Sequence, residues 1–307
     1  MNRRIKIYLE AARYNQWIKN LVVFTAPVFT GHLLETATIF RSILTFVIMS
    51  ILSSASYILN DIIDLKKDII HPQKKTRPLA SGRLKKHEAV FLVFVLTLTG
   101  LMLSAAFSTS LFIVSIIFFS LHFFYSLYLK RKTLLDIFSI SFSFVLRALA
   151  GEVATGYHIP IWLLITIFSL SLFMATVKRH AELVKHGTKT RIVLEKYPQH
   201  LLTFLTTTFA TISIVSYAFY TYFERVPIIR TPFTEFFSQY LPSFELRRWM
   251  MITIPFVVFG IARYAQLLYT KEQGERPEKI IVTDKILITT IVVWAIIVVS
   301  LIYVLQQ

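Results

Sequence analysis

The chain is a succession of long apolar stretches separated by shorter polar ones. We identify nine apolar segments, each close to the roughly 20 residues that an α-helix needs to span a bilayer. They cover residues 17–36, 39–65, 88–107, 109–129, 134–156, 160–177, 199–222, 247–269 and 282–305. Pro27 and Gly31 weaken the first segment as an ideal helix. The pattern predicts an all-α integral membrane protein with about nine transmembrane helices, in which residues 1–307 form a single transmembrane domain.

Lysine and arginine are distributed unevenly over the polar connections. If the N-terminus is cytoplasmic, 25 of these residues fall on the cytoplasmic side and five on the other, and three lie inside apolar segments. The positive-inside rule therefore predicts a multi-pass protein of the cell (inner) membrane, with its N-terminus in the cytoplasm and its C-terminus outside. Two long cytoplasmic connections, near 66–87 and 178–198, are the expected active-site loops.

Composition narrows the class further. Hydrophobic residues make up 55% of the chain, and the net charge is +16 although only 16% of residues are charged. This charge is explained by topology and by attraction to anionic membrane lipid. No soluble domain remains to bind nucleic acid, so we expect no such partner. Cysteine is absent, which excludes disulfides, thiolate metal sites and cysteine nucleophiles.

Three aspartates follow one another at helical spacing at the end of the second segment. Asp61, Asp64 and Asp68 fall within an arc of about 60° on a helix. Two carboxylates about 5–6 Å apart repel each other by about 3 kcal/mol at an effective dielectric near 20, so such a stripe requires cations. Mg²⁺ suits oxygen ligands and commonly bridges to substrate phosphates. The stripe therefore predicts metal-assisted diphosphate chemistry at the membrane surface.

The polar connection after the stripe, residues 71–82, is rich in cations. Lys74 and Arg77 could neutralise the phosphate oxygens that a metal does not bind. Pro72 and Pro78 restrict the backbone of this loop, and Gly82 permits a turn. The alternative is a basic loop held by anionic lipid, but that interpretation leaves the three aspartates unexplained.

These residues resemble the UbiA superfamily of intramembrane prenyltransferases. The family motifs N-D-x-x-D-x-x-x-D and R-P-x-x-x-G are matched by Asn60, Asp61, Asp64 and Asp68, and by Arg77, Pro78 and Gly82. The resemblance implies nine transmembrane helices around a central cavity and a Mg²⁺-dependent departure of diphosphate. It also implies that the three aspartates are the catalytic and metal-binding residues.

The second acidic motif of the family is altered in this chain. Where typical members carry another aspartate-rich cluster, the sequence reads Lys178-Arg179-His180-Ala181-Glu182. This change resembles the branch of the family that transfers phosphoribosyl to decaprenyl phosphate. Further matches to that branch are Gln16-Trp17-Ile18-Lys19-Asn20, Tyr125-Ser126 with Lys130, Asp136, and Leu146-Arg147 with Gly151.

The branch implies a specific reaction. The donor would be 5-phosphoribosyl 1-diphosphate and the acceptor a polyprenyl phosphate, and the lipid product would feed synthesis of a cell-envelope polysaccharide precursor. The expected substrate-binding residues are Lys19, Asn60, Lys74, Arg77, Tyr125, Lys130, Arg147, Lys178, Arg179, Glu182 and Arg191. The sequence does not divide the basic residues between the donor's 5-phosphate and the acceptor's phosphate.

Two other functions remain open at this stage. A more typical member would move a prenyl group from its diphosphate to an aromatic or glycerol-phosphate acceptor and would use the same three aspartates. A transporter would also have many helices and intramembrane charge, but the charges here cluster at one membrane side, and coupling ions are usually held near the midplane. Charged residues inside apolar segments, such as Lys19 and Arg147, usually face a cavity or a partner. The sequence leaves a homo-oligomer open.

Overall fold

The computed structural model describes residues 3–186, 197–224, 248–270 and 283–304, and this part of the chain contains helices and turns but no strand. The predicted all-α class is confirmed. The helices are α1 (Arg3–Ala12), η1 (Tyr14–Phe24), α2 (Thr25–Phe29), α3 (Thr36–Ile63), α4 (Leu65–Ile70), η2 (Lys74–Thr76), α5 (Lys86–Phe107), α6 (Thr109–Leu127), η3 (Leu129–Arg131), α7 (Leu135–Thr155), α8 (Ile161–His186), α9 (Gln199–Phe223), η7 (Trp249–Thr253), α11 (Ile254–Thr270), α13 (Lys285–Val299) and η8 (Ser300–Val304).

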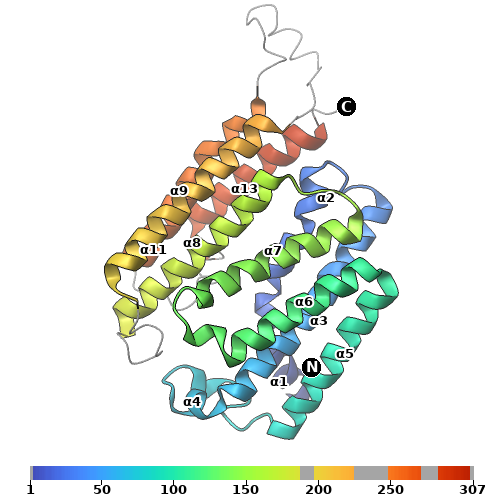
Figure 1. The fold of residues 1–307 in the computed structure, drawn as a ribbon, viewed down its shortest axis with the longest axis vertical. Helices are drawn as coiled ribbons and strands as arrows, with labels where there is room; N and C mark the ends of the chain where they lie inside the picture. Colours follow the sequence, from blue (N-terminus) through green and yellow to red (C-terminus); the bar gives the residue numbers. More distant parts are fainter. Residues whose placement is uncertain (1–2, 187–196, 225–247, 271–282, 305–307) are drawn as a thin grey trace, which may run out of the picture. The chain divides into compact units, whose positions relative to one another are not determined.

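The chain separates into two compact units. The described part of the first unit comprises residues 3–27 and 33–158, and the second contains 28–32 and the described residues from 159 onward. In the first unit α3, α5, α6 and α7 pack along one another (Figure 1). In the second unit α8 packs along α9, and α11 packs against α13.

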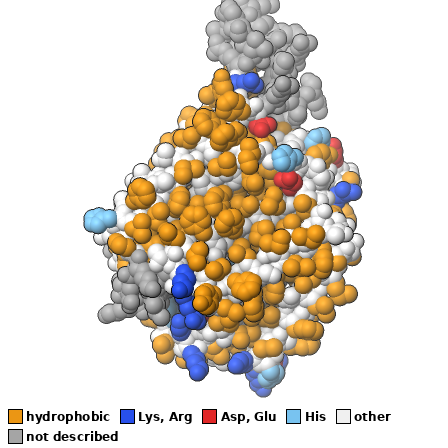
Figure 2. Space-filling view, viewed as in Figure 1, with side chains coloured by type: hydrophobic (Ala, Val, Ile, Leu, Met, Phe, Trp, Pro, Cys, Tyr) orange, Lys and Arg blue, Asp and Glu red, His pale blue; other side chains and the backbone are white. Residues whose placement is uncertain are grey.

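Eight helices within the described residues are long and apolar enough to cross a bilayer. They are Thr36–Ile63, Lys86–Phe107, Thr109–Arg131, Leu135–Thr155, Ile161–Val184, Gln199–Phe223, Trp249–Leu267 and Lys285–Tyr303. Large hydrophobic side chains are exposed along them, among them Phe91 and Phe94 of α5, and Figure 2 shows such side chains over most of one face. An exposed apolar surface of this extent is typical of contact with lipid. The protein is therefore a multi-pass membrane protein.

The first predicted segment, 17–36, does not form one continuous α-helix. It is divided between the 3₁₀-helix η1 and the five-residue helix α2, and the chain then turns at Gly31, whose φ is 81°. A proline within α2 and a left-handed glycine interrupt the helix for the reasons that the sequence indicated. The predicted count of nine spans is thus approximate.

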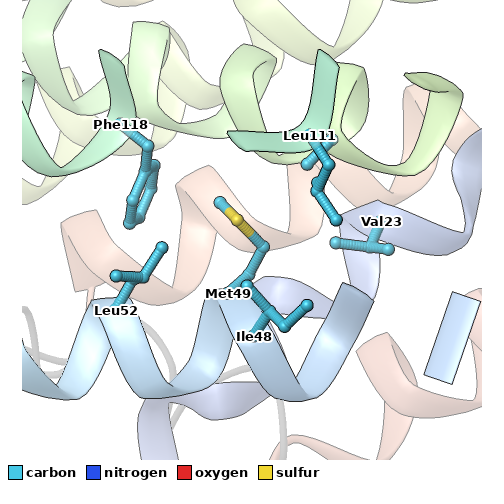
Figure 3. Close-up of a cluster of buried hydrophobic side chains, with 7 residues drawn as sticks. Val23, Ile48, Met49, Leu52, Leu111 and Phe118 are labelled. Atoms are coloured by element: carbon cyan, nitrogen blue, oxygen red, sulfur yellow. The ribbon is translucent and has the colours of Figure 1, made fainter. Parts of the chain in front are cut away.

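A cluster of buried apolar side chains fixes how η1, α3, α6 and α7 pack in the first unit. Its members are Val23, Ile48, Met49, Leu52, Leu111, Phe118 and Ala150. Figure 3 shows Met49 and Leu52 of α3 directed toward Leu111 and Phe118 of α6, with Val23 of η1 beside them. Because these side chains are almost completely buried, each makes many close dispersion contacts.

Gly151 permits the closest approach between η1 and α7. A Cβ atom at this position would lie 1.9 Å from the carbonyl oxygen of Val23, which is backbone and cannot rotate away. The small residue therefore sets the distance between the two elements. This distance places Asn20 of η1 beside Arg147 of α7.

We predict that Gly151→Ala destabilises the protein by about 1–3 kcal/mol or more, because the added methyl group forces η1 away from α7. Thermal unfolding of the purified protein in detergent measures the effect. Gly260→Ala in α11 is the matched control, since a Cβ there meets nothing within 4 Å and alanine is the better helix former. Equal melting temperatures for the two variants would contradict this account of Gly151.

Candidate active site

The aspartate stripe lies at a break between two helices. Asp61 belongs to α3, Asp68 belongs to α4, and Asp64 stands between them with φ −90° and ψ 4°. The expectation of one uninterrupted helix is therefore wrong at Asp64. The backbone nevertheless keeps helical hydrogen bonds across the break, from Asp64 N to Asn60 O and from Asp68 N to Asp64 O, both 2.9 Å. The three carboxylates thus stay on consecutive turns.

Arg77 joins the first and last aspartates of the stripe. Its Nη1 donates to Asp61 Oδ1 at 3.0 Å and to Asp68 Oδ2 at 2.6 Å. Both carboxylates are buried, with side-chain exposures of 7% and 5%. The loop that carries Arg77 is held by backbone hydrogen bonds, including one of 2.9 Å from Leu84 N to Pro78 O. The two family motifs that the sequence identified therefore meet in space.

Arg13 is a second cation on Asp61, and the sequence did not indicate it. Its guanidinium forms a short ion pair with Asp61 Oδ1 and lies over the ring of Tyr57, 5.3 Å from the centroid. Arg13 has a left-handed backbone, with φ 52°, between α1 and η1. Forty-eight positions separate it from Asp61, so no local pattern pointed to this pair.

Lys130 pairs with the middle aspartate. Its Nζ donates to Asp64 Oδ2 at 2.7 Å and to Asn60 Oδ1 at 2.9 Å. Lys130 lies in η3, which directly follows α6. Tyr125, also expected to bind substrate, is half-buried on α6. Lys74 begins η2, and its backbone N–H donates to Nδ1 of His71.

The carboxylate and cation charges of this site balance. Three aspartates face three cations, Arg13, Arg77 and Lys130. The described residues contain no group of three or more acidic, histidine or cysteine side chains that converges on one metal position. However, Mg²⁺ commonly binds one or two carboxylates and completes its coordination with water and substrate phosphates. Each aspartate uses only one oxygen in its recorded ion pairs, so this donor set fits such an ion.

Arg147 and Lys19, both expected to bind substrate, lie in the first unit as well. Arg147 is almost fully buried, and its Nε donates to Asn20 Oδ1 at 2.6 Å. Its Nη1 donates to the carbonyl oxygen and hydroxyl of Ser143, at 2.8 and 2.9 Å. Lys19 is half-buried and donates to Gln16 Oε1 at 3.1 Å.

The altered second motif lies in the second unit, on α8. This helix continues to His186, so the first nine residues of the predicted 178–198 loop are helical. The apolar pattern ends where charged residues begin at Lys178, but a helix can extend past the membrane boundary, as α8 does. Arg179 is buried and donates to Glu182 Oε2 at 2.8 Å, and Lys178 is half-buried. Arg191 lies outside the described residues.

The fold and site together define a class: a multi-helix membrane protein in which buried aspartates are paired with basic side chains at the end of a membrane-spanning helix. Residues 24–281 match the model of the UbiA prenyltransferase family. The chain belongs to this family, and it is a membrane-embedded transferase.

Two similar proteins of the same name match nearly the whole chain. It is 32% identical over 294 residues to a decaprenyl-phosphate phosphoribosyltransferase of Mycolicibacterium smegmatis, a match of 93% of this chain and 89% of that protein. It is also 32% identical over 307 residues to the protein of the same name from Corynebacterium glutamicum, covering 97% of this chain and 87% of that protein.

Solved structures support the fold. A UbiA homologue from Archaeoglobus fulgidus, solved bound to GPP and Mg²⁺, matches with a TM-score of 0.70 and 16% sequence identity. The match covers 98% of this chain and 99% of that one. At this identity the likeness establishes the shared architecture and leaves the substrate undetermined.

We predict that Arg77→Met lowers the free energy of unfolding by about 3 kcal/mol, because it removes the cation paired with buried Asp68 and leaves buried Asp61 with Arg13 alone. Thermal unfolding in detergent without divalent metal measures this loss. Arg83→Met is the matched control in the same loop. Arg83 pairs with Glu10 at exposed positions, 41% and 32% exposed, where a pair contributes less than about 1 kcal/mol. A larger loss for Arg83→Met would show that Arg77 does not stabilise the aspartates.

Proposed function

We propose that the protein transfers 5-phosphoribosyl from 5-phosphoribosyl 1-diphosphate to a polyprenyl phosphate of the decaprenyl type and releases diphosphate. The observation that carries this proposal is the aspartate site, in which Arg77 bridges Asp61 and Asp68 and Lys130 pairs with Asp64. Such a site combines ligands for a hard metal with donors for phosphate oxygens. The identity to proteins named for this activity supports the choice of substrates.

In this proposal the acidic residues would bind the metal ion and the basic residues would bind the diphosphate. Asp61, Asp64 and Asp68 would hold Mg²⁺, which supplies charge stabilisation to a departing diphosphate when it is bound. Arg77 and Lys130 lie directly beside these carboxylates and would donate to diphosphate oxygens, as would Lys74. Asn60, which accepts from Lys130, would orient that ammonium group.

The acceptor would be the nucleophile. A lipid phosphate oxygen forms a bond to the anomeric carbon as the bond from that carbon to the diphosphate oxygen breaks, which inverts the carbon. The phosphate is already anionic, so no general base is required. Two phosphate groups must then be held, and the candidates are Lys19, Tyr125, Arg147, Lys178, Arg179 and Arg191, with Glu182 orienting Arg179 through its ion pair.

The main rival is prenyl transfer from a prenyl diphosphate to an aromatic or glycerol-phosphate acceptor. It would use the same three aspartates, and the Archaeoglobus homologue was solved with GPP. The basic character of Lys178, Arg179 and His180 favours a donor that carries an additional phosphate. A transporter remains a remote alternative that no contact in the described residues favours.

The charge asymmetry supports a specific placement in the cell (inner) membrane. With 25 basic residues on one side and five on the other, the N-terminus would be cytoplasmic and the C-terminus outside. The active site would then face the cytoplasm, where a soluble sugar donor is available. The loops near 66–87 and 178–198 would belong to one transmembrane domain. We propose lipid and the two substrates as partners, without nucleic acid, and leave homo-oligomerisation open.

Incubation of protein-containing membranes with labelled 5-phosphoribosyl 1-diphosphate and polyprenyl phosphate tests the proposal. We expect label in the lipid fraction that depends on both the acceptor and Mg²⁺. Membranes lacking the protein provide the background. Absence of lipid-linked label, together with transfer from a labelled prenyl diphosphate, would establish the rival function.

We predict that Asp64→Asn lowers the turnover number by about 100-fold or more, because it removes one charge that would hold the metal beside the diphosphate. The initial rate of labelled lipid formation at saturating substrate measures this loss. Glu10→Gln is the control, since it removes a carboxylate paired with Arg83 at the surface and should leave the rate unchanged. Normal turnover of Asp64→Asn would reject the proposed metal role.

A further inference from the structure

Arg147 is a buried charge without a neutralising carboxylate. The residue is 2% exposed in the interior of the first unit. It contacts neutral groups of Asn20, Ser53 and Ser143, and it forms no ion pair with any described residue. The aspartate site presents the opposite arrangement, since each of its carboxylates has a cation. An unneutralised charge inside a membrane helix is costly, so binding of an anion at Arg147 would be favourable.

The surroundings of Arg147 hold its guanidinium in one orientation. The group lies over the rings of Phe118 and Phe144, 4.8 and 5.3 Å from their centroids. Asn20 is itself fixed by its amide, which donates to Ser50 at 2.9 Å. A side chain held by several hydrogen bonds and two aromatic faces loses little further entropy when it binds a ligand. The site is therefore preorganised.

A second observation, independent of the arginine, also indicates a ligand. The ring nitrogen Nε2 of His122 is buried and has no hydrogen-bond partner among the described residues. The imidazole packs against Phe118 at 4.6 Å between ring centroids, and it lies within the electrostatic reach of both Arg147 and Lys19. A buried polar nitrogen without a partner costs about 1–3 kcal/mol. A ligand with acceptor oxygens would satisfy it and the two cations together.

This cluster is distinct from the aspartate site. Ser53, which contacts Arg147, precedes Asp61 by eight residues on α3, a rise of about 12 Å. Tyr57 lies between them, interacting with Arg147 on one side and lying under Arg13 on the other. The carboxylates at the end of α3 are already paired with Arg13, Arg77 and Lys130. They therefore leave the charge on Arg147 uncompensated.

We infer that Arg147, Lys19 and His122 form a binding site for a phosphate monoester, deeper in the membrane than the aspartate site. The inference rests on the proposed function, because the proposed substrates are the molecules that carry such a phosphate. The ligand is either the 5-phosphate of the ribosyl donor or the phosphate of the polyprenyl acceptor, which share the same chemistry. The site recognises the phosphate by charge and hydrogen bonding, and the diphosphate is bound by the aspartate site.

Ligand-binding and enzyme-kinetic measurements on the Arg147→Gln and Lys19→Gln variants test this site. Arg147→Gln removes the charge but keeps hydrogen-bonding capacity, and Lys19→Gln changes a half-buried side chain whose one recorded hydrogen bond is to Gln16. We expect each variant to weaken phosphate-monoester binding at least 10-fold and to leave affinity for inorganic diphosphate with Mg²⁺ unchanged. Arg263→Gln is the matched control, since Arg263 is neutralised by Asp284.

Two arms distinguish the sources of the phosphate. If the donor's 5-phosphate binds here, inhibition by ribose 5-phosphate weakens in both variants while the KM for polyprenyl phosphate is unchanged. If the acceptor's phosphate binds here, that KM rises and ribose 5-phosphate inhibits as before. Wild-type affinity for both compounds in folded Lys19→Gln and Arg147→Gln protein would overturn the inference and leave the cluster a structural network.

The inference and the proposed function can fail separately. Thermal stabilisation by inorganic phosphate is measured without turnover, on the wild-type protein and on both variants. In one outcome the wild-type protein does not transfer phosphoribosyl, yet phosphate stabilises it and fails to stabilise the Arg147 and Lys19 variants. This outcome would support the phosphate site and reject the proposed reaction. If phosphoribosyl transfer occurs and phosphate stabilises all variants equally, the reaction stands and the site is wrong.

Discussion

The arrangement of the candidate active site depends on how buried carboxylates are neutralised. Asp61 and Asp68 lie on different helices, and both point toward one guanidinium, that of Arg77. Without a cation, two buried carboxylates close together would repel each other and remain poorly solvated. The bridge therefore ties the loop after α4 to the end of α3. It also places basic donors beside the oxygens that are candidates for binding a metal, which is the combination that diphosphate chemistry needs.

The first unit contains two polar centres of different charge. At the end of α3 three aspartates and three cations balance. In contrast, Arg147 of α7, which contacts Ser53 of α3, and Lys19 of η1 have no described carboxylate partner. A substrate that carries both a diphosphate and a separate phosphate, or a pair of substrates that does so, would complement both centres. This complementarity connects the phosphoribosyl reaction to the structure more specifically than the shared fold does.

The apolar segments and the aspartate motif were predictable because they are local. Hydropathy over about 20 residues located the eight helices that are long enough to span the membrane, and the spacing of Asp61, Asp64 and Asp68 indicated the candidate site. The break at Asp64 was not predictable, because residues 51–71 contain no proline or glycine that would indicate the end of a helix. The ion pair of Arg13 with Asp61 and the contact of Arg147 with Asn20 join residues 48 and 127 positions apart, and such pairs are set by helix packing.

The measurement that tests the central claim most directly is the mass and NMR spectrum of the lipid product made by the purified protein from 5-phosphoribosyl 1-diphosphate and polyprenyl phosphate. The account predicts a polyprenyl-phosphoryl-5-phosphoribose whose anomeric configuration is inverted relative to the donor. A product with retained configuration would contradict direct attack by the lipid phosphate. A product that carries a transferred prenyl group in place of a phosphoribosyl group would contradict the proposed reaction itself.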